Sequence, residues 1–174
     1  MNIIQRLLMT RRYIGIDPGS KGAIVAIDSD NNVLRFRDLS KDWLDYWIIM
    51  QDWEDWLCQW DSTEVAVEDV CGRPGQSCQA NTTFMKLAGM AELTAYSLDS
   101  GMVLVKPQVW KKHFGLIFPK TMTKAEKKRK SVELARELFP SVADSLLYSK
   151  DGRAEALLIA RYLKDVQENN GVDK

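Results

Sequence analysis

Four acidic residues have the types and the spacing that a metal site needs. Asp17 and Glu68 each follow a short apolar run of the kind that forms a buried strand. Asp151 and Glu155 are four residues apart, so they are expected to share one face of a helix. Carboxylate oxygens without a nearby histidine or thiolate suit a hard divalent cation, Mg²⁺ or Mn²⁺.

The chemistry that such a site supports is phosphodiester cleavage. Two ions about 4 Å apart activate a water and stabilise the leaving oxygen, with no covalent protein nucleophile. Without metal, the four acids repel one another and raise at least one pKa. Three of the acids also have a simpler interpretation: Asp17 begins a turn, Asp151 starts a helix and Glu155 is solvated. For Glu155 the surrounding apolar run Ala154–Ala160 favours the metal site.

The hydrophobic pattern predicts the elements that bring these acids together. Strands are expected at 13–17, 22–28, 33–38, 64–70 and 102–105. Helices are expected at 41–60, 81–98, 107–114 and 124–139, and a last helix follows Asp151 and Gly152 and ends near Lys164. Asn81 or Thr82 is the expected N-cap of the second helix, and Thr123 with Glu126 forms a capping box on the fourth. The first three strands form an antiparallel meander. A right-handed crossover then places the Asp17 end of the first strand beside the Glu68 end of the fourth.

The predicted fold class is therefore α/β, with a mixed five-stranded sheet flanked by helices. A chain of 174 residues, 45% hydrophobic, suits one globular domain, expected at 13–165. Residues 1–12 are expected to form a leader that is either frayed or a small docking segment, and 166–174 a flexible tail. No apolar run reaches the roughly 18 residues of a membrane span. Three cysteines without paired spacing indicate reduced thiols and a cytoplasmic protein: Cys58, Cys71 and Cys78.

Charge is unevenly distributed although the formal net charge is zero. Between Lys106 and Lys130 there are nine basic residues and one acid, whereas between Asp38 and Asp69 there are ten acids and one base. The basic segment predicts phosphate contacts with nucleic acid, and the alternative is a solvated basic helix. The predicted DNA-binding residues are Lys106, Lys111, Lys112, Lys124, Lys127, Lys128, Arg129 and Lys130.

Two of the predicted helices have unusual compositions. The helix at 41–60 holds five of the six tryptophans. Helical spacing predicts a core-facing stripe of Trp43, Trp47, Met50 and Leu57, widened by Trp53, Trp56 and Trp60. An additional partner surface is the alternative for this helix. The helix at 81–98 is rich in small residues, which allow close approach either to the sheet or to a second subunit.

Three segments carry a resemblance to a known family. IGIDPGSKG, VAVEDV and DGRAEALLIA resemble the three acidic motifs of the RuvC family of Holliday junction resolvases, which have a ribonuclease H-like fold. The resemblance extends over roughly 13–163, and the third motif looks most like phage-encoded members. It implies a Mg²⁺-dependent endonuclease, with two metal ions, that acts as a homodimer. Such an enzyme makes paired symmetrical nicks in a four-way DNA junction.

The resemblance also implies roles for particular residues. Asp17 and Glu68 match the acids of the first and fourth strands, and Glu155 matches the last acid of the final helix, usually aspartate. Asp151 is the remaining acid, four residues before Glu155 where bacterial members have a gap of three. Cys71 stands where bacterial members have an aromatic wedge, so no such wedge is expected here. A lysine also assists catalysis in this family, and either Lys106 or a residue of the 124–130 cluster is expected to supply it.

Other functions are compatible with parts of the pattern. A ribonuclease H-type enzyme would cleave RNA–DNA hybrids with the same acids. The DPGSKG turn is similar to the phosphate-binding hairpin of actin-like ATPases and sugar kinases, but those enzymes need two such domains. A non-catalytic protein that binds branched DNA is a further alternative.

In the RuvC family that the sequence resembles, the helix at 81–98 matches the element that pairs across the homodimer.

Overall fold

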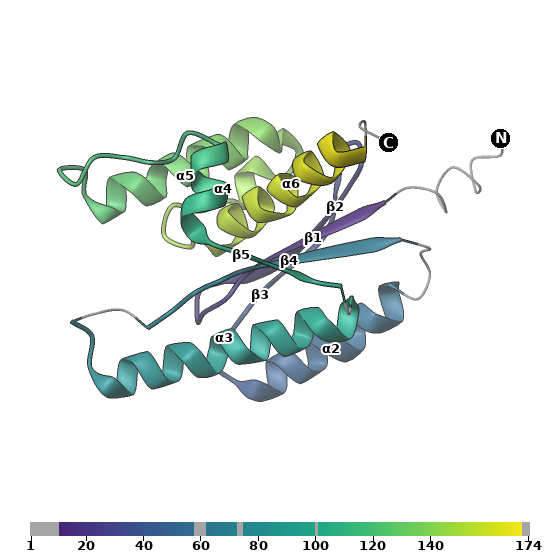
Figure 1. Cartoon of the computed structure of the whole chain (residues 1–174), viewed down its shortest axis with the longest axis horizontal. Coiled ribbons are helices and arrows are strands. Elements are labelled where there is room, and N and C mark those ends of the chain that lie inside the picture. Colours follow the sequence, from purple (N-terminus) through teal and green to yellow (C-terminus); the bar gives the residue numbers. More distant parts are fainter. Residues whose placement is uncertain (1–10, 58–61, 73–74, 100, 172–174) are drawn as a thin grey trace.

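A mixed five-stranded sheet runs through the middle of the protein, between two layers of helices (Figure 1). The computed structural model describes residues 11–57, 62–72, 75–99 and 101–171. The strands are β1 (Arg12–Asp17), β2 (Ala23–Asp28), β3 (Val33–Asp38), β4 (Thr63–Glu68) and β5 (Val103–Val105), in the order β3-β2-β1-β4-β5. β1, β2 and β3 pair antiparallel, whereas β4 is parallel to β1 and β5 is parallel to β4. The predicted fold class is confirmed.

The helices form one layer on each face of the sheet (Figure 1). One layer holds α2 (Trp43–Leu57) and α3 (Cys78–Leu98), and the other holds α4 (Pro107–His113), α5 (Lys124–Leu138) and α6 (Gly152–Gly171). Side chains of each strand alternate between the layers: Ile14 and Ile16 pack toward α2 and α3, and Tyr13 toward α6. Over the ranges that the structure describes, no helix is long and apolar enough to span a membrane.

The predicted capping box of α5 is present. The Thr123 hydroxyl accepts a hydrogen bond from the backbone N–H of Glu126, and Glu126 accepts one from the backbone N–H of Thr123. α5 ends at Leu138, and Pro140 then begins a 3₁₀ helix, η1 (Pro140–Ser145), that the sequence analysis did not predict. The basic helix therefore has a defined start beside the site described below.

The start of α3 was predicted wrongly. The helix begins at Cys78, and its N-cap is Ser77, whose hydroxyl accepts from the backbone N–H of Ala80 at 3.2 Å. Asn81 and Thr82, the expected caps, lie inside the first turns. The next residue, Thr83, donates its hydroxyl to the carbonyl of Gln79 within the same helix at 3.0 Å.

The buried face of α2 was predicted only in part: Trp53 and Leu57 of the predicted stripe are buried, but Trp43 and Trp47 are not. Trp43 and Trp47 are 67% and 53% exposed, so they face solvent and not the core. The side chains that face the sheet are Tyr46, Ile49, Trp53 and Leu57. Both sets have helical spacing, and hydrophobicity alone does not decide between two apolar faces of one helix. Trp60 and the side chain of Met50 lie outside the described residues.

α6 is longer than expected. It continues to Gly171, so the residues after Lys164 are helical where a polar tail was predicted. The Lys164 ammonium is buried against β2 and β3 turn residues, where it donates to Asn31 Oδ1 at 2.9 Å. This contact and the continued helical backbone extend the ordered part of the chain beyond 165.

Residues 1–10, Cys58 and 172–174 lie outside the described residues. The two cysteines that are described, Cys71 and Cys78, are free thiols.

Candidate metal centre

The parallel pairing of β1 and β4 sets two carboxylates side by side. The strands are in register with Ile16 opposite Val67, so Asp17 and Glu68, the next residue on each strand, reach the same edge of the sheet. Carboxyl ends of parallel strands are where α/β proteins place their sites. The turn after Asp17 is narrow: Gly22 donates its backbone N–H to the carbonyl of Gly19 at 3.1 Å. Asp17 is thus held at the end of β1, where it lines a cavity.

The third carboxylate comes from α6, which packs very closely on β1. A Cβ on Gly15 would lie 2.1 Å from the carbonyl oxygen of Ala156 and 2.4 Å from the backbone nitrogen of Ala160. Only a residue without a side chain permits this approach. Because Glu155 precedes Ala156, the close packing brings its carboxylate toward Asp17.

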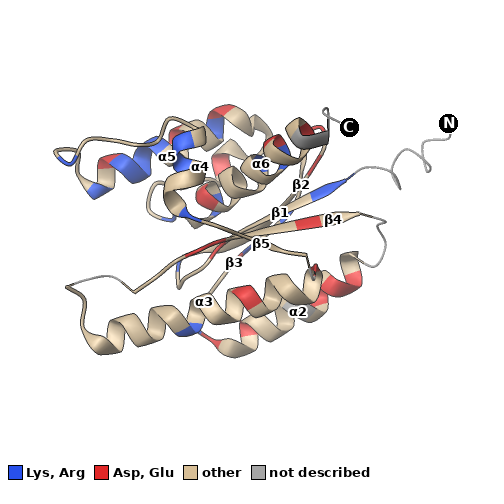
Figure 2. Cartoon of the chain, in the orientation of Figure 1, with Lys and Arg blue, Asp and Glu red and all other residues tan. Residues whose placement is uncertain are grey.

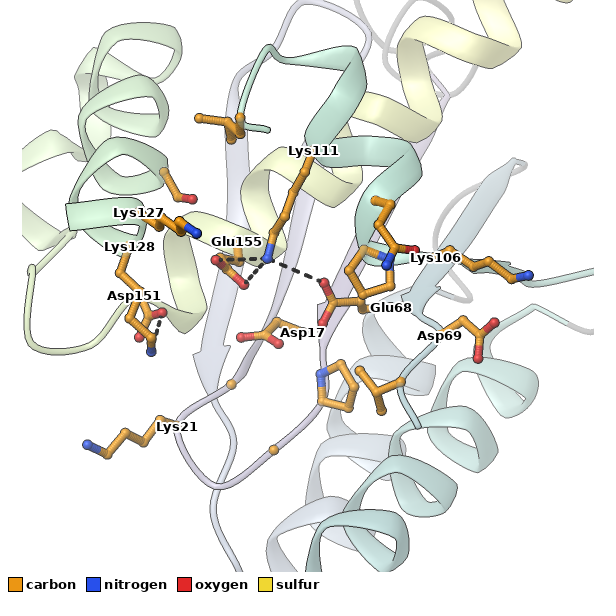
Figure 3. Close-up of a pocket in the computed structure, with 18 of the residues that line it drawn as sticks. Asp17, Lys21, Glu68, Asp69, Lys106, Lys111, Lys127, Lys128, Asp151 and Glu155 are labelled. Atoms are coloured by element: carbon orange, nitrogen blue, oxygen red, sulfur yellow. Dashed lines mark hydrogen bonds and ion pairs between the residues drawn. The ribbon is translucent and has the colours of Figure 1, made fainter. Parts of the chain in front are cut away.

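Asp17, Glu68 and Glu155 form one cluster. A carboxylate oxygen from each lies within 4.8 Å of the other two. Figure 3 shows the three side chains pointing toward one another at the bottom of a cavity. Mg²⁺ and Mn²⁺ prefer oxygen ligands, and three anionic oxygens at this spacing are within reach of a shared cation. The donor set therefore fits the divalent metal that the sequence analysis expected.

Asp151 lies at the same cavity but outside this cluster. It immediately precedes α6, and its backbone carbonyl accepts from the N–H of Glu155 at 2.9 Å. Its side chain forms an ion pair with Lys128, with Nζ 2.6 Å from Oδ2 (Figure 3). The expectation that all four acids converge is therefore met by three, because a lysine of the basic helix holds the fourth.

The electrostatics of the cluster favour a bound cation. Burial raises the pKa of Asp17 well above its usual range, and the charges of Glu155, Glu68 and Asp151 raise it further. The Lys111 ammonium acts in the opposite direction. A proton on Asp17 or a metal ion beside it relieves the same repulsion, so the two compete for this site.

The lysine that contacts the acidic cluster is Lys111. Its Nζ lies 3.5 Å from Glu155 Oε1 and 4.0 Å from Glu68 Oε1 (Figure 3). The sequence analysis expected Lys106 or the 124–130 cluster to supply the lysine nearest the metals. Of these, Lys128 reaches only Asp151. Lys111 was predicted to bind DNA as part of the basic segment, and α4 places it in contact with Glu68 and Glu155.

Sequence analysis missed Trp110. Its indole Nε1 donates to Glu68 Oε1 at 3.0 Å, and both side chains are buried. A tryptophan in a short helix is ordinarily a core residue, so the sequence carried no signal for this contact. Trp110 and Lys111 are consecutive residues of α4 that both reach the carboxylate of Glu68.

The cavity around the cluster is large, and lysines surround its acidic centre. Its volume is about 830 Å³, far more than metal ions require. The lysines that line it are Lys21, Lys106, Lys111, Lys124, Lys127 and Lys128. Lys21 was not predicted. Figure 2 shows Lys and Arg residues concentrated on α5, whereas several Asp and Glu residues lie on α2 in the opposite layer.

Three predicted DNA-binding residues lie away from the cavity. Lys112 is exposed on α4. Arg129 and Lys130 are both paired with Glu133 along α5, at 2.9 Å each. Two further acids differ in their positions: Asp69 lines the cavity, whereas Asp144 is exposed in η1.

The fold matches that of a solved structure. T. thermophilus RuvC in complex with a Holliday junction substrate is similar to this chain with a TM-score of 0.54 and 15% sequence identity. The similarity covers 88% of this chain and 92% of that chain. At this identity the likeness establishes the ribonuclease H-like fold of RuvC. No protein-family model matches the sequence, and no curated protein matches it.

Proposed function

We propose that this chain is a RuvC-like, Mg²⁺-dependent, structure-selective endonuclease that resolves four-way DNA junctions by paired symmetrical nicks. The observation that carries the proposal is the cluster of three carboxylates at the base of a lysine-lined cavity. The fold shared with a junction-bound RuvC supports the choice of a branched DNA substrate.

The acids divide into two groups. Asp17, Glu68 and Glu155 hold the metal directly, and Asp151 joins them when Lys128 is drawn to a DNA phosphate. Bound Mg²⁺ or Mn²⁺, as two ions, supplies Lewis-acid stabilisation of charge at the phosphate undergoing cleavage. Glu155 replaces the usual aspartate, and its longer side chain lets it reach the cluster from a site four residues beyond Asp151.

The lysines position the DNA. Lys106, Lys124 and Lys127 line the cavity, and the described part of the chain places no acid in ion-pair contact with them, so they are available to phosphates. Lys111 sits between the cluster and the cavity, where its ammonium neutralises charge near the reacting phosphate. These contacts bind the backbone without reading the sequence.

The proposed homodimer uses α3. Its outward face carries Met85, Gly89, Leu93 and Tyr96, which are exposed and largely apolar. Figure 2 shows few charged residues along this helix. Pairing of α3 between two copies covers this face and provides two metal centres, as coordinated nicking of opposite strands requires.

The role of the lysines gives a prediction about salt. Lys127→Gln is expected to weaken junction binding and to reduce the slope of log affinity against log salt concentration by about 1, because one phosphate contact is lost. Lys130→Gln, on the same helix but paired with Glu133 outside the cavity, is the matched control and should leave the slope unchanged. Binding is measured by fluorescence anisotropy in Ca²⁺ over several salt concentrations. Equal slopes for both variants contradict the assignment of Lys127.

The experiment that tests the proposed function compares substrates. A labelled four-way junction, a linear duplex and an RNA–DNA hybrid are incubated with the protein in Mg²⁺, Mn²⁺ or EDTA. Metal-dependent paired nicks in opposing junction strands are expected. Preferential cleavage of the hybrid identifies a ribonuclease H-type enzyme instead. Binding of the junction without cleavage in either metal identifies a non-catalytic DNA-binding protein.

A further inference from the structure

A hydrogen bond between Trp110 and Glu68 connects the acidic cluster with the hydrophobic core on the α6 side of the sheet. Trp110 is fully buried among the residues under α6, and its indole N–H is 3.0 Å from Glu68 Oε1. Glu68 is only 6% exposed. A buried indole N–H needs an acceptor, and a buried carboxylate needs donors, so each group satisfies the other.

The geometry of α4 directs two donors to one oxygen. Trp110 Nε1 reaches Glu68 Oε1 from the core, and Lys111 Nζ lies 4.0 Å from the same oxygen on the cavity side. The Lys111 ammonium also lies 4.7 Å from the centre of the Trp110 ring. The rigid indole has no rotamer freedom within the packed core, whereas Lys111 is a long flexible side chain that phosphate can attract. Trp110 is therefore the fixed member of the pair.

We infer that Trp110 is a positioning residue of the metal centre: its indole N–H holds the Glu68 carboxylate in the orientation that joins Asp17 and Glu155. This inference rests on the proposed metal site and deepens it. Donors that orient a ligating carboxylate typically affect metal affinity by 10- to 100-fold. Loss of the indole N–H lets the Glu68 carboxylate rotate, so its oxygen is no longer preorganised for the cation.

The test is metal binding in the absence of DNA. Trp110→Phe keeps an aromatic ring in the core and removes only the N–H donor and part of the ring. Trp53→Phe is the matched control, since Trp53 is equally buried and its Nε1 has no hydrogen-bond partner in the described structure. Trp53 belongs to α2, in the layer on the opposite face of the sheet. Mn²⁺ affinity is measured by electron paramagnetic resonance and by calorimetry.

The expected result is a dissociation constant for Mn²⁺ that rises about 10- to 100-fold in Trp110→Phe and stays within about twofold of wild type in Trp53→Phe. Incorporation of 3-benzothienylalanine at position 110 provides a second variant. It has the shape of tryptophan with sulfur in place of N–H, so it folds as the wild type does and should show the same loss.

Two outcomes overturn the inference, and they are distinguishable. Wild-type affinity for Mn²⁺ in the benzothienylalanine protein shows that Trp110 only packs the core, while the metal site stands. Failure of the wild-type protein itself to bind Mn²⁺ removes the metal site, and with it both the proposed function and the role of Trp110.

Discussion

Replacing Asp17 with asparagine is expected to lower the rate of junction cleavage by about 10³-fold or more. Asp17 lies at the centre of the carboxylate cluster, and charge stabilisation by a catalytic metal is worth several kcal/mol. Each loss of about 1.36 kcal/mol from transition-state stabilisation is a tenfold loss of rate. The measurement is single-turnover cleavage of a labelled junction in Mg²⁺ with enzyme in excess.

The control for this substitution is Asp144→Asn. Asp144 is an exposed acid of η1 that does not line the cavity, so its replacement should leave the cleavage rate within about twofold of wild type. Junction binding in Ca²⁺ separates catalysis from binding, and Asp17→Asn should retain it because the cavity lysines are unchanged. Normal cleavage by Asp17→Asn in Mg²⁺ would falsify the metal mechanism.

The same substitution is expected to change the pH dependence of stability. Burial and three neighbouring acids raise the pKa of Asp17 in the folded protein above the value of about 3.9 in an unfolded chain. At a pH below this unfolded value the residue is protonated in both states and has no effect. As pH rises from there through the folded pKa, the unfolded state loses the proton first, so folding stability is lost.

In metal-free buffer, Asp17→Asn should therefore be more stable than wild type at about pH 7 to 8, and the difference should disappear toward about pH 4. Thermal unfolding in EDTA over this pH range measures it, and each kcal/mol corresponds to roughly 2–4 °C for a chain of this size. Mg²⁺ should stabilise the wild type and not the variant, since a ligand of the folded state adds stability only where it binds. A stability difference that does not vary with pH contradicts the assigned burial of Asp17.

The sequence was sufficient to predict the sheet and three of the four acids because those features depend on local patterns. Asp17 and Glu68 end apolar strands, and parallel pairing then makes them neighbours without further information. The capping box of α5 is likewise local, because its two residues, Thr123 and Glu126, are three positions apart. Features of this kind follow from periodicity and capping chemistry.

The contacts that complete the site depend on distances between elements that periodicity does not encode. Asp151 was expected to join the cluster, but whether it does depends on where α5 places Lys128. Trp110 meets Glu68 across 42 positions of sequence, and nothing in its own neighbourhood indicates that contact. Trp43 and Trp47 of α2 were wrongly expected in the core for a similar reason, because this helix has two apolar faces and only packing against the sheet decides which one is buried.

Gly15 provides the largest expected effect on folding, and it links the fold to the site. In Gly15→Ala the new Cβ would meet backbone atoms of α6 at 2.1 and 2.4 Å, and backbone cannot rotate away as a side chain can. We expect a loss of about 3 kcal/mol in the free energy of unfolding, at the upper end for overpacked cores, and a fall in melting temperature of roughly 6–12 °C.

Gly72→Ala is the control for this prediction. A Cβ there meets the Asn81 side chain at 3.7 Å, an ordinary contact, so the melting temperature should change little. If α6 instead moves outward to accommodate the methyl group added by Gly15→Ala, Glu155 moves with it, because Glu155 precedes the clashing Ala156. The folded Gly15→Ala protein should then lose stabilisation by Mg²⁺ even at temperatures where it remains native. Retention of both the melting temperature and the Mg²⁺ effect would mean that the contact between β1 and α6 does not set the position of Glu155.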